Sequence, residues 1–329
     1  MSRLLVLLCF LCSNAYVHAE VILRRDTLGS IQGEIQSAGK TGLLIITSEN
    51  QNKTVRIPWG SIIEIQPKKN RPNIDALLIE GKHIWRAKNR LLRGDIQLAL
   101  PLLESQFMRL SGTSSSDTRL VIEGLLRALL AQGLIDKAVI PWLETVRLEE
   151  AGFTSPYNML DPILEKESLL CRHLPIMALQ LIENNKLDSY AVSQLPKTKF
   201  FAQLVEQGVE EGSSFAQQIL RASSGNEEAS STLLAQYGTL EEWQKVWVNY
   251  AHFLFAKSKQ DIQNAKLYLA TVAAVDPTVQ PYLTGMAMVQ LADILESEQK
   301  LDEARRIRYE MNHFFPSHPY FFTNTNKGK

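Results

Sequence analysis

A small residue recurs at nearly constant spacing through most of this 329-residue chain. Six alanines lie 39, 40, 38, 49 and 39 residues apart: Ala99, Ala138, Ala178, Ala216, Ala265 and Ala304. The apolar residues around them follow helical spacing, and closely crossing helices require small side chains. A period of this length indicates a stack of similar helical units. The alternative is a non-repetitive helical bundle in which the alanine spacing arises by chance.

Turn residues stand at fixed offsets from these alanines. Gly94 and Gly133 come five residues before the first two, and Pro277 and Pro316 come twelve residues after the last two. These offsets resemble the tetratricopeptide-repeat family of helical hairpins over about residues 73–316, although the spacing here exceeds that family's roughly 34 residues. The resemblance implies a mainly α fold: a TPR-like α-solenoid of about six hairpins over residues 69–322 that binds protein or peptide segments.

Residues 20–68 carry a strand pattern instead. Turn residues separate five short β-type runs, Val21–Arg25, Ser30–Ile35, Leu43–Ser48, Thr54–Pro58 and Ser61–Gln66. Because a hairpin pair alone is marginal, we expect the five strands to close on themselves into a barrel. Residues 55–63 resemble SH3-like and Sm-like barrels, which bind peptides, oligonucleotides or neighbouring domains. Trp59, the only aromatic residue in this segment, is predicted to lie in a core.

Residues 1–19 read as a secretory signal peptide. Arg3 precedes the apolar run Leu4–Cys12, and Val17-His18-Ala19 supplies a cleavage site before Glu20. No segment approaches the roughly 20 apolar residues that span a bilayer. We therefore expect an exported protein that does not span the membrane, periplasmic or, as the alternative, secreted. Cleavage leaves Cys171 as the only cysteine, so no internal disulfide forms. Residues 323–329 are predicted to be a disordered tail.

Basic residues are concentrated near the start of the chain. The 35 basic and 35 acidic residues cancel overall, which disfavours a nucleic-acid binder, but residues 20–100 hold 13 basic and 8 acidic side chains. On a predicted helix, one face carries Lys82, Arg86, Arg90 and Arg93, and another carries Ile84, Ala87 and Leu91. The basic stripe is a candidate docking site for an anionic partner, such as an acidic protein segment, a phospholipid surface or an envelope polymer. The alternative is a solvated face that balances the acidic rear of the chain.

The histidines offer no catalytic or metal-binding arrangement. His83, His173, His252, His313 and His318 are scattered, and Cys171-Arg172-His173 has no second ligand pair at zinc-like spacing. Glycine-rich phosphate loops and dinucleotide fingerprints are missing from the sequence. We expect no metal, no cofactor and no enzyme activity, and predict a non-enzymatic scaffold or adaptor. The alternative is an enzyme associated with an envelope polymer or glycan, with a helical catalytic domain.

Two aromatic groups are predicted to serve packing. Trp243, Trp247, Tyr250 and Leu254 share one helical face, as core residues do. The run of residues 314–322 contains five aromatic side chains and is too apolar to extend into water. Because the end of a helical stack must be covered, we expect this run to fold back over the last hairpin.

Overall fold

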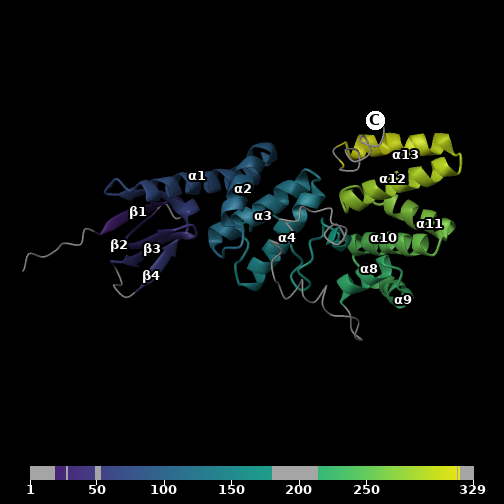
Figure 1. Ribbon diagram of the computed structural model, residues 1–329, viewed down its shortest axis with the longest axis horizontal. Coiled ribbons are helices and arrows are strands. Elements are labelled where there is room, and N and C mark those ends of the chain that lie inside the picture. The colour runs from purple at the N-terminus through teal and green to yellow at the C-terminus, as the bar shows by residue number, and fades with distance from the viewer. Residues whose placement is uncertain (1–18, 27–28, 49–52, 180–213, 317, 319–329) are drawn as a thin grey trace, which may run out of the picture. The chain divides into compact units, whose positions relative to one another are not determined.

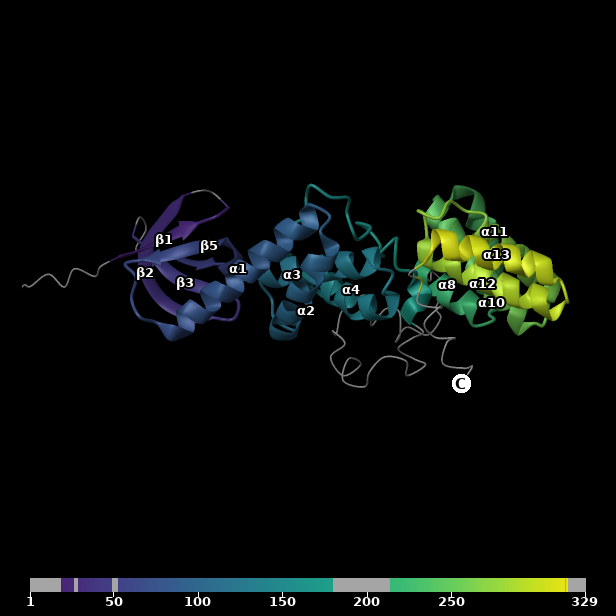
Figure 2. The same ribbon diagram turned by 90° about the horizontal axis from the view of Figure 1, so that it is seen from above.

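The computed structural model describes residues 19–26, 29–48, 53–179, 214–316 and 318 (Figures 1 and 2). The chain divides into two compact units, Met1–Arg86 and Ala87–Lys329. The first unit, called the sheet unit below, contains a five-stranded antiparallel sheet. The second, the helical unit, is helical through most of its described part. The sequence correctly predicted this mainly helical chain with a β-sheet at its start.

All five predicted strands are present. They are β1 (Glu20–Arg24), β2 (Ser30–Gly39), β3 (Gly42–Thr47), β4 (Thr54–Ile57) and β5 (Ile62–Gln66), and the sheet order is β4-β3-β2-β1-β5. Strand β2 is four residues longer than expected, and its Gly33 pairs with both Glu20 of β1 and Thr47 of β3. A Cβ at Gly33 would collide with the carbonyl of Ile46, so the close approach of β2 to β3 at this position requires glycine.

The sheet is open, which corrects the predicted closed barrel. In the described part of the chain β4 and β5 form its two edges, joined by the 3-10 turn η1 (Trp59–Ser61). Helix α1 (Pro72–Leu92) lies over the sheet, and its Ile74, Leu77 and Leu78 pack against the sheet core (Figure 2). The helix therefore covers the apolar surface that barrel closure would otherwise bury.

Trp59 lies in the core of the sheet unit, as predicted. Its side chain is fully buried, and its Nε1 donates a hydrogen bond to the carbonyl of Gly39 over 2.7 Å. Gly81 of α1 packs so closely on the Trp59 backbone that a Cβ would collide with it. This packing attaches the first part of α1 to the sheet, and the compact sheet unit extends to Arg86.

The helical unit continues with pairs of antiparallel helices (Figure 1). After α1 come α2 (Ile96–Leu110), α3 (Ser116–Ala131), α4 (Ile135–Glu150), α8 (Phe215–Ser223), α9 (Glu227–Gln236), α10 (Glu242–Ser258), α11 (Ile262–Ala273), α12 (Pro281–Ser297) and α13 (Leu301–Phe314). Short 3-10 turns, η2 (Ile176–Leu179) and η3 (Tyr237–Thr239), lie between them. Helices that follow one another in the chain pack together from α2 to α4 and from α10 to α13.

One turn geometry recurs in four of these hairpins. The six spaced alanines are all buried, and Ala99, Ala138, Ala265 and Ala304 lie in α2, α4, α11 and α13. Five residues before each of these four the backbone is left-handed, with φ of 80° at Gly94, 68° at Gly133, 60° at Gln260 and 64° at Gln299. The next residue in each case donates its N–H to a carbonyl five residues back, which closes the end of the first helix.

The expected series of six hairpins is interrupted after α4. Residues 151–175 form turns, bends and backbone without regular secondary structure where a helix was expected, and Ala178 lies in η2. Pro156, Pro162 and Pro175 explain the break, since proline lacks the N–H that a helix needs. Ala216 lies in α8, and residues 180–213, where a further hairpin was predicted, are outside the described residues.

Both predicted aromatic groups pack in the helical unit. Trp243 and Trp247 are buried with ring centroids 4.9 Å apart, and the Phe215 ring stacks on Trp247 at 6.3 Å. Phe315, only 8% exposed, packs against Met288, Val289 and Met311, so the described end of the chain folds back over the last hairpin as expected. Residues 317 and 319–322 of the terminal run, the predicted tail and residues 1–18 lie outside the described residues.

Candidate functional site

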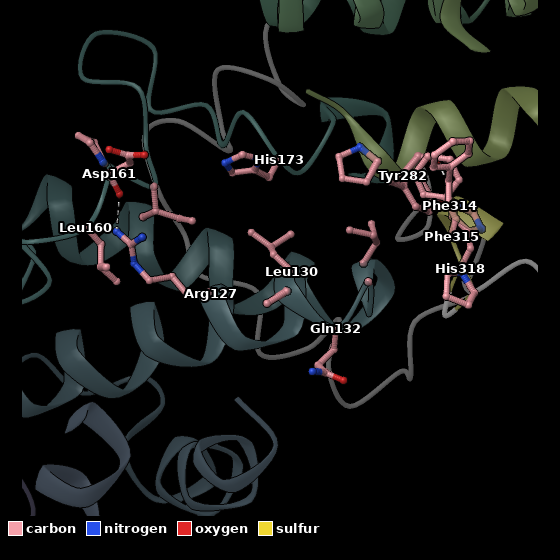
Figure 3. Close-up of a pocket in the computed structure, with 17 residues that line it drawn as sticks. Arg127, Leu130, Gln132, Leu160, Asp161, His173, Tyr282, Phe314, Phe315 and His318 are labelled. Atoms are coloured by element: carbon pink, nitrogen blue, oxygen red, sulfur yellow. Dashed lines mark hydrogen bonds between the residues drawn. The ribbon is translucent and has the colours of Figure 1, made fainter. Parts of the chain in front are cut away.

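A cavity of about 610 Å³ lies in the helical unit (Figure 3). Three parts of the chain line it: the end of α3 with the α3–α4 turn, the segment 160–163 with His173, and the start of α12 with the chain just after α13. Most of its walls are apolar, and they include Leu130, Ile135, Leu160, Ile163, Tyr282 and Phe314. This cavity, called the groove below, is the candidate binding site.

The wall from α3 and α4 depends on their connecting turn. Gly133 takes the left-handed conformation, and the N–H of Leu134 then bonds to the carbonyl of Leu129 over 2.9 Å. This turn ends α3 just past Leu130 and starts α4 at Ile135, so both side chains lie at the groove. The sequence predicted this turn, but not that it borders a cavity.

An ion-pair network fixes the polar end of the groove. Arg127 donates hydrogen bonds to the carbonyl of Asp161 over 2.9 Å and to the carboxylate of Glu123 over 2.8 Å. Glu123 is fully buried and also accepts from Arg119 over 3.1 Å and from Ser155 over 2.7 Å. The buried carboxylate is therefore hydrogen-bonded both to arginines of its own helix and to Ser155. Together with the bond from Arg127 to Asp161, these contacts hold residues 155–161 against α3.

Tyr157 also attaches the same segment to α3. Its hydroxyl donates to the carbonyl of Leu120 over 3.0 Å and lies directly against Gly124, where a Cβ would collide with it. The Arg127 guanidinium stands 5.6 Å from the centre of its ring. Gly124 is thus the residue that lets an irregular segment pack closely enough on a helix to form a wall.

Both histidines at the groove are held in the neutral form. Burial, together with the cations Arg172 and Arg127, lowers the pKa of His173, and burial lowers the pKa of His318. Since the ordinary value is 6.5, both imidazoles are uncharged at neutral pH. The two histidines therefore add no charge to the groove, whose charged lining residues are Arg127 and Asp161 at its polar end.

The folded-back end of the chain forms the remaining wall. The His318 imidazole stacks on Tyr282, with ring centroids 5.4 Å apart and an interplanar angle of 17°, and its Nε2 donates to the Tyr282 carbonyl over 3.0 Å. Phe314 remains 55% exposed beside them. Sequence reasoning missed the residues of this site, because Leu130 and Tyr282 are far apart in the chain and each reads as ordinary core.

The four residues of the predicted basic stripe have different environments. Lys82 and Arg86 are exposed on α1, and Arg93 is exposed in the turn after it. Arg90 is half-buried and donates to the carbonyl of Leu98 over 2.9 Å. The opposite face was correctly predicted, since Ile84, Ala87 and Leu91 are buried. Arg90 therefore stabilises the α1–α2 turn, while the other three cations face solvent.

Other site chemistry is sparse in the described part of the chain. Within those residues no group of three or more His, Cys, Asp or Glu side chains is placed to hold a metal ion. Cys171 is buried, and burial raises the pKa of its thiol to about 11, which keeps it protonated and unreactive. Among the described helices, none combines the length and apolar character needed to cross a membrane.

Comparison of the chain with protein-family models, with curated proteins and with solved structures gave no match. The groove and the exposed cations of α1 therefore have to be interpreted from their own geometry.

Proposed function

We propose that this protein is an exported, non-enzymatic adaptor that binds an apolar segment of another protein in the groove of its helical unit. The observation that carries the proposal is the groove itself: about 610 Å³, with largely apolar walls and one end fixed by Arg127 and its partners. Binding sites of this kind are concave and mostly apolar, with a few fixed polar groups that orient the ligand.

The recurring turn supports a TPR-like solenoid as the framework of this adaptor. The same left-handed residue precedes a buried alanine by five positions in four hairpins, as similar stacked units require. Stacks of helical hairpins commonly present extended surfaces for peptides. The five-stranded sheet with its covering helix supports a small SH3-like module that precedes the stack in the sequence.

The chemistry of the groove favours a peptide with two large apolar side chains. Burying one Leu or Phe side chain contributes about 1.5–3 kcal/mol. Two such anchors, beside Tyr282 and Leu130, contribute about 3–6 kcal/mol together. Since association alone costs about 4 kcal/mol or more, a stable complex also needs the hydrogen bonds and further contacts that the groove offers. The backbone of the peptide would meet the polar end near Arg127 and Asp161.

Export follows from the predicted signal peptide, and the start of the sheet is compatible with its cleavage. Strand β1 begins at Glu20, directly after the predicted cleavage site. The carboxylate of Glu20 is buried and pairs with Lys69 over 3.1 Å and with Arg71. Cleavage between Ala19 and Glu20 leaves the strand and both ion pairs intact, in the periplasm or in a secreted protein.

The groove supports binding better than hydrolysis of a glycan or envelope polymer. Asp161 is its one carboxylate among the lining residues. A glycoside hydrolase places two carboxyl groups about 5–9.5 Å apart across the scissile bond. An enzyme here would therefore need a second acid from elsewhere.

The proposal is tested by selecting peptides from a displayed random library on the immobilised parent protein. We expect enrichment of peptides with two aromatic or aliphatic residues, and no enrichment on Leu130→Glu, which places a charge in the groove. The matched control is Leu267→Glu on α11, where the side chain is already 61% exposed. Parent selections without apolar enrichment, or equal enrichment on a folded Leu130→Glu, would contradict it.

A further inference from the structure

The charged lining of the groove, in the part of the chain that the structure describes, consists of the cation Arg127 and the anion Asp161. Arg127 pairs with Glu123 over 2.8 Å and uses both its Nε and its Nη2 to do so. Arg119 pairs with the same carboxylate over 3.1 Å and with Glu149 over 2.7 Å. Two arginines and two glutamates thus cancel, and this network offers no net positive charge to a ligand.

The Asp161 carboxylate, in contrast, is not neutralised. Arg127 binds the backbone carbonyl of Asp161, and none of the ion pairs among the described residues includes its exposed carboxylate. Burial and the cations Arg172 and Arg127 lower the pKa of His173, whereas Asp161 raises it. The carboxylate therefore lies near the imidazole, and both residues line the groove (Figure 3).

A second carboxylate lies near the other end of the groove (Figure 3). Burial and then the charge of Asp136 raise the pKa of the Tyr282 hydroxyl, so Asp136 lies close to it. Lys137, the next residue, is exposed and offsets this charge in part. The other Asp, Glu, Lys or Arg directly next to a lining residue in the described chain is Arg172, which pairs with Glu241 over 3.8 Å. The groove and its borders thus carry a net negative charge, two carboxylates against one ammonium.

We propose that the peptide bound in the groove carries a lysine or arginine next to its apolar residues, and that this cation pairs with the carboxylate of Asp161. The inference rests on the proposed peptide-binding function and adds the charge that the groove selects. A purely apolar peptide would displace water from Asp161 and leave its charge unpaired, which is costly. An acidic peptide would meet the same carboxylate without an unbalanced cation to offset it. A cationic side chain removes both penalties.

The wall around Asp161 also suits the stem of such a side chain. Leu160 and Ile163 lie in the same segment and line the groove with it. The aliphatic part of a lysine or arginine can pack on apolar side chains while its charged end stays hydrated or paired. Apolar contacts and the ion pair therefore act together at this end of the groove.

The test is selection of peptides from a displayed random library on the immobilised protein, with enrichment scored separately for apolar residues and for Lys and Arg. We expect both on the parent. Asp161→Asn keeps the size of the side chain and the backbone carbonyl that Arg127 binds, so it should keep the apolar enrichment and lose that of Lys and Arg. The matched control is Glu104→Gln, which removes an exposed carboxylate from α2 and should select as the parent does.

Affinity measurements then isolate the ion pair. An enriched peptide is compared by fluorescence anisotropy with a version that has glutamine in place of its cation. Exposed ion pairs contribute about two- to five-fold in affinity, so we expect the glutamine version to bind the parent that much more weakly and to bind Asp161→Asn as well as the original peptide does. The difference on the parent should shrink as salt is raised, because salt screens exposed charges. Thermal melting confirms that each variant is folded.

The outcomes separate this inference from the adaptor proposal. Apolar enrichment without Lys or Arg on the parent, or equal Lys and Arg enrichment on Asp161→Asn, would overturn the inference and leave the adaptor proposal intact. Loss of both kinds of enrichment on folded Asp161→Asn would also overturn it, since Asp161 would then support the groove instead of selecting a charge. Absence of apolar enrichment on the parent would overturn the adaptor proposal, and this inference with it.

Discussion

The imidazole of His318 occupies the space where a side chain at Gly285 would stand. A Cβ built on Gly285 would lie 2.6 Å from Cδ2 of the imidazole. The surface of α12 thus has a gap at Gly285, near Tyr282, and the His318 side chain fills it. The wall of the groove that His318 forms with Tyr282 depends on this missing side chain.

Gly285→Ala should displace His318 and open the groove while leaving α12 intact. The lost hydrogen bond costs about 1 kcal/mol, and alanine returns a similar amount through its better helix propensity. We therefore expect a nearly unchanged melting temperature, faster chymotrypsin cleavage near Phe315, and weaker binding of a selected peptide. Gly238→Ala is the control, since a Cβ there meets no neighbour within 4 Å. Unchanged cleavage would show that His318 does not need the gap.

The recurring hairpin turn predicts substitutions with opposite effects on the stability of the protein. Gln260 and Gln299 adopt a left-handed backbone that costs an L-residue about 1–2 kcal/mol. Gln260→Gly and Gln299→Gly should therefore each stabilise the protein by about 1 kcal/mol, after the entropy cost of glycine. Gly133→Ala at the equivalent position should destabilise it by a similar amount. Chemical denaturation measures the free energy of unfolding of all three variants. If all three changed stability in the same direction, the turns would not share one backbone geometry.

The buried alanines should not accept larger side chains. Ala138 and Ala304 are fully buried in α4 and α13, so Ala138→Leu and Ala304→Leu should each overpack their contacts and cost about 1–3 kcal/mol. Ala76→Leu, at an exposed position of α1, is the control and should change stability little. If both core variants melt like the parent, these alanines do not mark helix crossings.

Local patterns predicted the local structure well. The five strands, the turns at Gly94 and Gly133, and the buried alanines could all be read from spacing along the chain. Gln260 and Gln299 could not be recognised as turn residues, because glutamine has no preference for left-handed backbone. Their role is visible only in the structure, where each adopts left-handed backbone five residues before Ala265 or Ala304, just as Gly94 and Gly133 do before their alanines.

Features that depend on distant parts of the chain were missed. The closed barrel was wrong because the strand pattern contains no information on α1, whose Leu77 covers the sheet core. Residues 151–175 do not form the helix that the repeat period predicted, because three prolines in this segment prevent continuous helical hydrogen bonding. The groove joins Leu130 to Tyr282, 152 positions apart, and neither residue carries a local signal of binding. Long-range packing is what a single sequence leaves undetermined.

Stability should fall as the pH drops below about 6.5. His252 is 1% exposed, its Nδ1 shares a hydrogen bond of 2.9 Å with Ser230, and burial lowers its pKa from 6.5. The unfolded chain therefore takes up a proton first, and acidification favours unfolding. His252→Leu with Ser230→Ala should show a shallower fall in melting temperature between about pH 7.5 and 5.5. A smaller slope should remain from His173 and His318. Equal slopes would mean that His252 does not titrate as described.

The most direct test of the adaptor account is site-specific photocrosslinking in the cells that produce the protein. A photoreactive phenylalanine analogue at Phe314 places the probe at the groove, and the same analogue at Leu267 places it on exposed α11. The account predicts a discrete protein crosslinked from Phe314 through a peptide rich in apolar residues, and none from Leu267. No crosslink from Phe314, or the same set of crosslinks from both positions, would contradict it.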